Sequence, residues 1–268
     1  MLGAIVGDVV GSRYEWHNIK SKTFDLFSDR NKPTDDSVMS LAVAQAILNC
    51  DGEYDRLSEE TVICMQSLGR KYPRAGYGGS FRRWLLSEQP RPYGSWGNGS
   101  AMRVSACGFA ARSLEEAIAL SAKVTEVTHN HPEGMKGAEA VAAAIYLARE
   151  GRSLSEIREH ILRHYYQIDF RLDDIRASYR FDVSCQGSVP QALEAFFESE
   201  SFEDTIRNAI SIGGDSDTIA AIAGGIAEAY YGIPDEIRTA TMGYLDQTLS
   251  DILLAFEKRY PSKTMAES

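Results

Sequence analysis

The sequence predicts an all-α fold, a compact orthogonal bundle of many helices. Helix-start signatures, a serine followed three residues later by an acidic residue, recur at Ser113, Ser153 and Ser201. The apolar residues after Ser113 and Ser153 are spaced mostly three and four apart, which is the period of one buried helical stripe. Alternating strand patterns are nearly absent, and the best candidate, residues 179–184 (YRFDVS), is short and lies in a polar connection.

The first predicted helix, residues 1–15 (MLGAIVGDVVGSRYE), carries glycine at every fourth position: Gly3, Gly7 and Gly11. An interior glycine costs a helix about 1 kcal/mol relative to alanine, so a close approach of another element has to compensate. The expected partner is the helix that follows Asp217, which is rich in alanine and contains a Gly-Gly pair. This pairing would bring Glu15, at the end of the first helix, near the start of the partner helix.

Asp8 lies on the same face of the first predicted helix as Glu15, one heptad earlier. The two residues are therefore about two turns, or ~10 Å, apart along the helix axis. We interpret Asp8 as a buried hydrogen-bonding residue rather than a ligand.

Size and composition predict a single domain over residues 1–268. The chain has 268 residues, of which 44% are hydrophobic, and shows no internal repeat, low-complexity segment or proline-rich linker. A formal charge of −10, from 28 basic and 38 acidic residues, disfavours nonspecific nucleic-acid binding and anionic membranes. The apolar N-terminal stretch is too short for a membrane span. We expect a cytoplasmic monomer, since no heptad seam is present.

The four cysteines are widely spaced and form no C-x-x-C pair. They are expected to be buried thiols, and a zinc site is not expected.

Two acidic clusters stand directly before two predicted apolar helices, at residues 34–37 (TDDS) and 213–218 (GGDSDT). Taken singly, each aspartate is explained as a helix cap. Each cluster, however, holds two carboxylates and a threonine, and four carboxylates packed together without cations are unfavourable. Oxygen ligands without His or Cys suit Mg²⁺, Mn²⁺ or Ca²⁺. With Glu15, the clusters suggest two cations about 4 Å apart that hold a substrate and activate water.

Two glycine-rich segments, residues 74–81 (RAGYGGSF) and 97–105 (GNGSAMRVS), each lead into a predicted helix. Both can present backbone N–H groups at a positive helix end to a pyrophosphate, although either is also explained as an ordinary loop. Arg103 can pair with a phosphate or with an acidic residue in the core. No G-x-G-x-x-G follows a strand, which disfavours a Rossmann site.

The segment THNHPEG places two histidines before another predicted helix. As a metal pair they lack a third soft ligand, and Pro132 indicates a shaped turn. His131 is therefore interpreted as structural. Several aromatic residues near these loops, Tyr77, Tyr93, Trp96 and Phe109, are candidates to stack on a base, and the sequence does not select one.

These motifs, in their order along residues 1–233, resemble the ADP-ribosylglycohydrolase family of the dinitrogenase-reductase-activating type. The resemblance implies an all-α fold with a di-metal cleft, two bound divalent cations (Mg²⁺ or Mn²⁺), and hydrolysis of the bond joining ADP-ribose to a modified protein side chain or small molecule. It implies metal ligation by Thr34, Asp35, Asp36, Asp215, Asp217 and Thr218. Catalytic carboxylates would come from Asp35, Asp36, Asp215 and Glu15. Asp35 or Asp36 is favoured for positioning or deprotonating the water, with Asp215 as the competitor, and the sequence does not separate metal ligand from general base.

The same resemblance implies that the ADP-ribose moiety is bound by the glycine-rich segments and by the histidine segment. The candidate residues are Gly78, Gly79, Ser80, Gly97, Asn98, Gly99, Ser100, Met102, Arg103, Thr128 and His129.

Three functional interpretations follow. The first is a hydrolase that removes ADP-ribose from a modified side chain, with arginine as the first candidate and serine as the second, or from a related conjugate. The second is a catalytically silent ADP-ribose-binding protein on the same fold, which the complete set of candidate ligands disfavours. The third is a terpenoid synthase. The acidic motif of that class requires a further Asp or Glu at position 39 or 40, where this chain has Met39 and Ser40.

Overall fold

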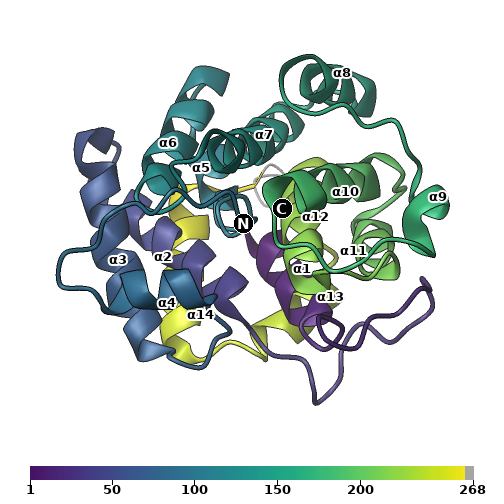
Figure 1. Ribbon diagram of the computed structural model, residues 1–268, viewed down its shortest axis with the longest axis horizontal. Coiled ribbons are helices and arrows are strands. Elements are labelled where there is room, and N and C mark those ends of the chain that lie inside the picture. Colours follow the sequence, from purple (N-terminus) through teal and green to yellow (C-terminus); the bar gives the residue numbers. More distant parts are fainter. Residues whose placement is uncertain (263–268) are drawn as a thin grey trace.

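The structure is a computed structural model that describes residues 1–262, and these form an all-α fold (Figure 1). Within this range there is no β-strand, and the strand candidate at residues 179–184 contributes only an isolated bridge between Gly97 and Ser184. The helices, in chain order, are α1 (Leu2–Gly11), α2 (Asp35–Cys50), the 3₁₀-helix η1 (Tyr54–Arg56), α3 (Leu57–Lys71), α4 (Gly79–Leu86), α5 (Ser105–Ala110), α6 (Leu114–Glu126), α7 (Pro132–Arg149), α8 (Leu154–His164), α9 (Leu172–Arg176), α10 (Cys185–Phe197), α11 (Phe202–Ser211), α12 (Ser216–Tyr231), α13 (Asp235–Met242) and α14 (Gln247–Arg259).

The predicted helix starts are confirmed. Ser113, Ser153 and Ser201 each accept a hydrogen bond from the backbone N–H three residues further on, and Ser153 completes a reciprocal capping box. Gly151, with φ of 75°, follows the end of α7. Local sequence therefore determines where these helices begin and end.

Helices α1 and α12 form the central pair of the molecule, and the predicted glycine stripe lies in their contact (Figure 1). A Cβ atom built on Gly7 would lie 2.0 Å from the carbonyl oxygen of Ala220. One built on Gly3 would lie 2.2 Å from the carbonyl oxygen of Gly224. Helix α2 packs against α1, and α7, α10 and α11 pack against α12. The stripe thus brings the end of α1 against the start of α12.

The first helix is shorter than the sequence predicts. It ends at Gly11 rather than at Glu15, because the Asn31 side chain donates hydrogen bonds to the carbonyl oxygens of Val9 (2.7 Å) and Val10 (3.2 Å). The last carbonyls of α1 are therefore satisfied by a residue of the following loop. Glu15 lies in the turn beyond the helix, so its distance from Asp8 is not set by helical rise.

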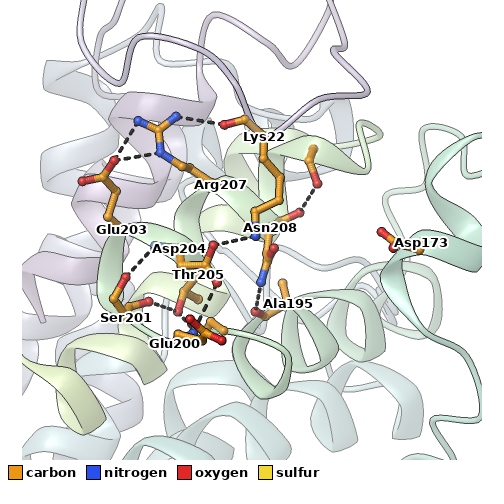
Figure 2. A network of polar contacts seen from close by, with 12 residues as sticks. Lys22, Asp173, Ala195, Glu200, Ser201, Glu203, Asp204, Thr205, Arg207 and Asn208 are labelled. Carbon is orange, nitrogen blue, oxygen red and sulfur yellow. Dashed lines mark hydrogen bonds and ion pairs between the residues drawn. The ribbon is translucent and has the colours of Figure 1, made fainter.

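The loop between α1 and α2 is tied to α11 by a polar network (Figure 2). Arg207 of α11 donates to the carbonyl oxygens of Lys22 (3.0 Å) and Phe24 (2.7 Å) and pairs with Glu203, while Lys22 pairs with Asp204. These contacts hold residues 22–24 of the loop against α11.

The cysteines are free thiols, as expected; Cys64, Cys107 and Cys185 are buried and Cys50 is half-buried. Among residues 1–262, no helix combines the length and apolar character needed to cross a membrane.

Candidate active site

A cleft of about 380 Å³ opens where the N-terminal ends of α2, α4 and α12 converge. Its walls include Asp35 and Asp36 of α2, Ser80 of α4, and Asp217 and Thr218 of α12. Helix N-termini carry a partial positive charge and free N–H groups, so three of them at one cleft favour anionic groups. The two acidic clusters of the sequence, far apart along the chain, share this cleft.

Carboxylates from four segments gather at the base of the cleft. Oxygen atoms of Asp8, Asp36 and Asp217 lie within 4.8 Å of one another, and so do oxygen atoms of Glu15, Asp215 and Asp217. Thr218 Oγ1 donates to Asp36 Oδ2 at 3.2 Å, whereas Asp36 Oδ1 is buried without a hydrogen-bond partner. A buried carboxylate oxygen with no donor is unfavourable in the absence of a bound cation.

Asp8 is the buried hydrogen-bonding residue that the sequence predicts. Its Oδ2 accepts bonds from the backbone N–H groups of Thr34 (2.8 Å) and Ser37 (3.0 Å) and from the Ser37 hydroxyl. Its Oδ1 accepts from Thr34 Oγ1 at 2.6 Å. With four donors on two oxygens, the Asp8 side chain is used to hold the start of α2 in place.

The capping interpretation of the aspartates does not account for the geometry. Thr34, not an aspartate, is the N-cap of α2 and accepts from the backbone N–H of Asp36 at 3.3 Å. Asp215 occupies the N-cap position of α12, but its side chain makes no capping hydrogen bond. It accepts instead from Asn98 Nδ2 at 2.7 Å. The carboxylates are therefore free to face the cleft.

Burial and mutual repulsion raise the pKa of each carboxyl group in the cluster. Burial, followed by the charges of Asp8 and Asp35, raises the pKa of Asp36 well above its usual value. Burial raises the pKa of Asp217 in the same way, with Asp215 as the next cause. For Asp35, burial and then Asp8 raise the pKa to about 7.

Glu15 behaves in the same way, since burial and then the charge of Asp215 raise its pKa to about 7. The cluster thus retains protons unless cations neutralise it. Its donors are all oxygen atoms, and Asp217 belongs to both groups, so the residues fit hard divalent cations.

The glycine-rich segments reach the cleft where the sequence predicts. The residues that line it are Gly78, Gly79, Ser80, Gly97, Asn98, Gly99, Met102, Arg103 and His129. Ser100 and Thr128 are fully buried beside the cleft. Ser100 Oγ donates to the carbonyl oxygen of Gly97 at 3.0 Å, so this hydroxyl shapes the loop.

Arg103 is buried in the cleft wall with 1% of its surface exposed. Its Nη2 donates to Thr128 Oγ1 (2.6 Å) and to the carbonyl oxygen of Val124 (3.2 Å), while Nε has no partner. Burial lowers the pKa of Arg103 to about 10. Within residues 1–262 no carboxylate forms an ion pair with it, so of the two partners that the sequence left open, the acidic core residue is not found.

The two histidines of the THNHPEG segment, His129 and His131, lie in different surroundings. His131 is the N-cap of α7, where its Nδ1 accepts from the backbone N–H of Glu133 at 3.2 Å, which confirms a structural role. His129 lies in the cleft wall with its Nδ1 2.7 Å from Thr128 Oγ1. Burial, and then the charge of Arg103, lowers the pKa of His129 well below its usual value, so the ring is neutral.

Some lining residues were not predicted from the sequence. Phe181 and Val183 reach the cleft because Asn98 donates its backbone N–H to the carbonyl oxygen of Val183 at 2.7 Å. This contact joins two loops that are distant along the chain, so no local sequence pattern predicts it. The one signal in the sequence was the presence of apolar residues within a polar connecting segment.

Comparison with known proteins gives a consistent result. A family model described as ADP-ribosylglycohydrolase matches residues 1–262. ADP-ribosylhydrolase ARH3 of Bos taurus is 28% identical, with 91% of this chain and 88% of that protein covered. The ADP-ribosyl-[dinitrogen reductase] glycohydrolase of Rhodospirillum rubrum is also 28% identical, with the same shares covered. A solved ADP-ribosylglycohydrolase-related protein complex has the same fold, with a TM-score of 0.70 at 22% identity over 96% of this chain and 95% of that one.

Proposed function

The chain belongs to the ADP-ribosylglycohydrolase family, and from this premise we propose that it is a divalent-metal-dependent enzyme that hydrolyses the bond between ADP-ribose and an arginine side chain. The observation that carries the proposal is the convergence of two acidic groups and three helix N-termini on one cleft. Family membership also removes the terpenoid synthase interpretation. Serine-linked and other ADP-ribose conjugates are the next candidate substrates.

The proposed cofactors are two divalent cations, Mg²⁺ or Mn²⁺. Asp36 and Asp217 would hold one of them, Asp215 and Asp217 would hold the other, and the Thr34 and Thr218 hydroxyls lie beside these carboxylates. Bound there, the cations supply Lewis-acid polarisation of substrate oxygen atoms and neutralise the buried carboxylates.

Asp35 is our candidate for the general base. It is half-exposed at the cleft, whereas Asp36 is buried against Thr218. Gly76 leaves room for Asp35, since a Cβ atom there would lie 2.8 Å from Asp35 Oδ1. Asp35 would accept the proton of a water that attacks the anomeric carbon, through a transition state of oxocarbenium character.

The remainder of the cleft suits a pyrophosphate and a cationic leaving group. Arg103, which lacks a carboxylate partner, and the N-terminal end of α4 offer positive charge to the two phosphates. Glu15, Asp35 and Asp215 also line this cleft. An N-ribosyl guanidinium is cationic and departs as a neutral guanidine, so it needs no proton donor.

The test is release of free ADP-ribose from matched peptides that carry the modification on arginine or on serine, with a nucleotide-linked conjugate as a third substrate. We expect the highest kcat/KM for the arginine conjugate. A higher kcat/KM for serine would overturn the choice of acceptor. Tight ADP-ribose binding without release from any conjugate would support the silent binder instead.

Metal binding should appear as a pH-dependent gain in thermal stability. The raised pKa values of Asp36, Asp217 and Asp35 mean that the contribution of these three groups to the stability of the metal-free protein is fully present only below the unfolded-state pKa, about 3.8. Without metal, the free energy of unfolding should fall as the pH rises through the folded-state values, about 7 for Asp35 and Glu15.

Mn²⁺ at 100 times its dissociation constant should add about 2.7 kcal/mol to the free energy of unfolding. The increase in Tm caused by Mn²⁺ should be larger at pH 8 than at pH 5.5, because protons compete with the metal at the lower pH. Calorimetry with Mn²⁺ and with chelator at both pH values measures this. An equal shift at the two pH values would argue that the metal binds away from the carboxylate cluster.

A further inference from the structure

Two exposed aromatic side chains lie together at the mouth of the cleft. Trp16 and Phe181 are stacked, with ring centroids 5.0 Å apart and an angle of 22° between the ring planes. Both line the cleft, yet Trp16 is 72% exposed and Phe181 is 41% exposed. They come from segments far apart in the chain, the loop between α1 and α2 and the connection that precedes α10.

Exposed apolar side chains gathered at the mouth of a cleft indicate a surface that binds a ligand. Among the large apolar side chains that the described part of the chain leaves exposed, Trp16, Phe181 and Val183 all line this one cleft. Large aromatic side chains gain free energy from burial, and a cluster left open around a cleft is typical of a surface that a ligand covers. Neither ring is needed to fill the core.

The backbone on both sides of the pair is held in place. Asn18, two residues after Trp16, donates to the carbonyl oxygen of Gly214 (2.9 Å) and accepts from its N–H (2.8 Å). On the other side, the carbonyl oxygen of Val183, two residues after Phe181, accepts from the backbone N–H of Asn98 at 2.7 Å. The aromatic pair is therefore a fixed feature of the cleft mouth and not a mobile tip.

The pair stands at the acidic end of the cleft. Trp16 directly follows Glu15, whose carboxylate belongs to the group with Asp215 and Asp217. Phe181 directly precedes Asp182, whose charge acts on Asp215. Since the bond to be cleaved must lie at these carboxylates, the stacked rings border the departing acceptor, while Arg103 offers charge to the phosphates.

We propose that Trp16, supported by Phe181, determines acceptor specificity by receiving the guanidinium group of an ADP-ribosylated arginine on its exposed indole face. The inference rests on the proposed function. A planar cation is attracted to the face of an indole ring, which is the best of the aromatic side chains for this contact. Glu15 and Asp182 are the chain neighbours of the two aromatic residues. A serine acceptor has no cation and gains nothing from the ring.

The test compares Trp16→Ala and Trp16→Phe with the wild type on the arginine and serine conjugates. Loss of one cation–π contact should lower kcat/KM for the arginine conjugate by about fivefold to tenfold in Trp16→Ala. It should leave the serine conjugate and the Kd of ADP-ribose within about twofold, and Trp16→Phe should recover most of the loss. Inhibition by agmatine, a free guanidinium probe, should weaken in parallel.

Trp96 provides the matched control. It is 54% exposed, contacts His131 with ring centroids 5.4 Å apart and an angle of 60° between the ring planes, and is not among the residues that line the cleft. Trp96→Ala should therefore leave the arginine-to-serine ratio unchanged. An equal effect of Trp16→Ala on both conjugates, or no effect on either, would overturn the specificity role while the hydrolase proposal stands. Absence of release by the wild type from every conjugate would instead overturn the proposed function.

Discussion

Replacing Asp36 with asparagine is expected to lower kcat by roughly a hundredfold to a thousandfold while the protein stays folded. Asp36 is 3% exposed, its Oδ1 has no hydrogen-bond partner, and its Oδ2 accepts from Thr218. The substitution removes a negative charge where we propose that a cation binds. Asp217→Asn should act in the same way, because Asp217 belongs to both carboxylate groups.

The thermal stability of metal-free Asp36→Asn should not fall along with its activity. In the presence of chelator, Asp36→Asn should unfold at a temperature equal to or above that of the wild type, because a repelled buried carboxylate is gone. With Mn²⁺, the variant should lose most of the Tm shift that the wild type gains. Steady-state kinetics and calorimetry on the same preparation measure both effects.

Glu257 is the matched control for a buried carboxylate outside the cleft. It is 6% exposed and pairs with Arg238, whose Nη1 donates to Glu257 Oε1 at 3.0 Å. Glu257→Gln should lower Tm and leave kcat close to the wild-type value at temperatures where the variant is folded. Near-wild-type turnover by both Asp36→Asn and Asp217→Asn would contradict the assignment of the metal site.

The largest loss of stability is expected for Gly7→Ala. A Cβ atom at Gly7 would lie 2.0 Å from the carbonyl oxygen and 2.2 Å from the carbonyl carbon of Ala220. Both are backbone atoms in the middle of α12, so no side chain can move aside and the two central helices must separate. The cost should be about 3 kcal/mol or more in the free energy of unfolding, although alanine has the higher helix propensity.

Urea denaturation of Gly7→Ala and Gly79→Ala measures this effect. Gly79 is the first residue of α4, and the nearest atom to a Cβ there is the Arg83 Nη1, at 3.9 Å. Gly79→Ala should therefore be at least as stable as the wild type. Equal stability of the two variants would show that close packing does not explain the glycine stripe.

Features with a local or periodic cause were predictable from the sequence. The spacing of Gly3, Gly7 and Gly11 identified both the packed face of α1 and its partner helix, because close helix packing requires small residues at a regular interval. The serine caps were predictable because the N–H group that each one accepts from lies three residues away. The two acidic clusters were recognised from composition, since a cap uses one carboxylate and each cluster has two.

Features set by contacts between distant segments were not predictable in the same way. The end of α1 depends on Asn31, which lies 22 residues beyond Val9 in the sequence. Phe181 enters the cleft through a bridge between two loops, in a segment whose residue pattern suggested a strand. The partner of Arg103 could not be chosen because it depends on which acidic residues the fold brings near, and none of the described ones forms an ion pair with it.

We propose that hydrolysis of ADP-ribose conjugates in this cleft requires divalent cations at the buried carboxylate cluster. The most direct test is release of ADP-ribose from an arginine-linked conjugate by the wild-type enzyme with Mg²⁺ or Mn²⁺, then with excess chelator, then with metal restored. We predict release that stops with chelator and returns with metal. Release that continues at the same rate in chelator would contradict the metal-dependent site.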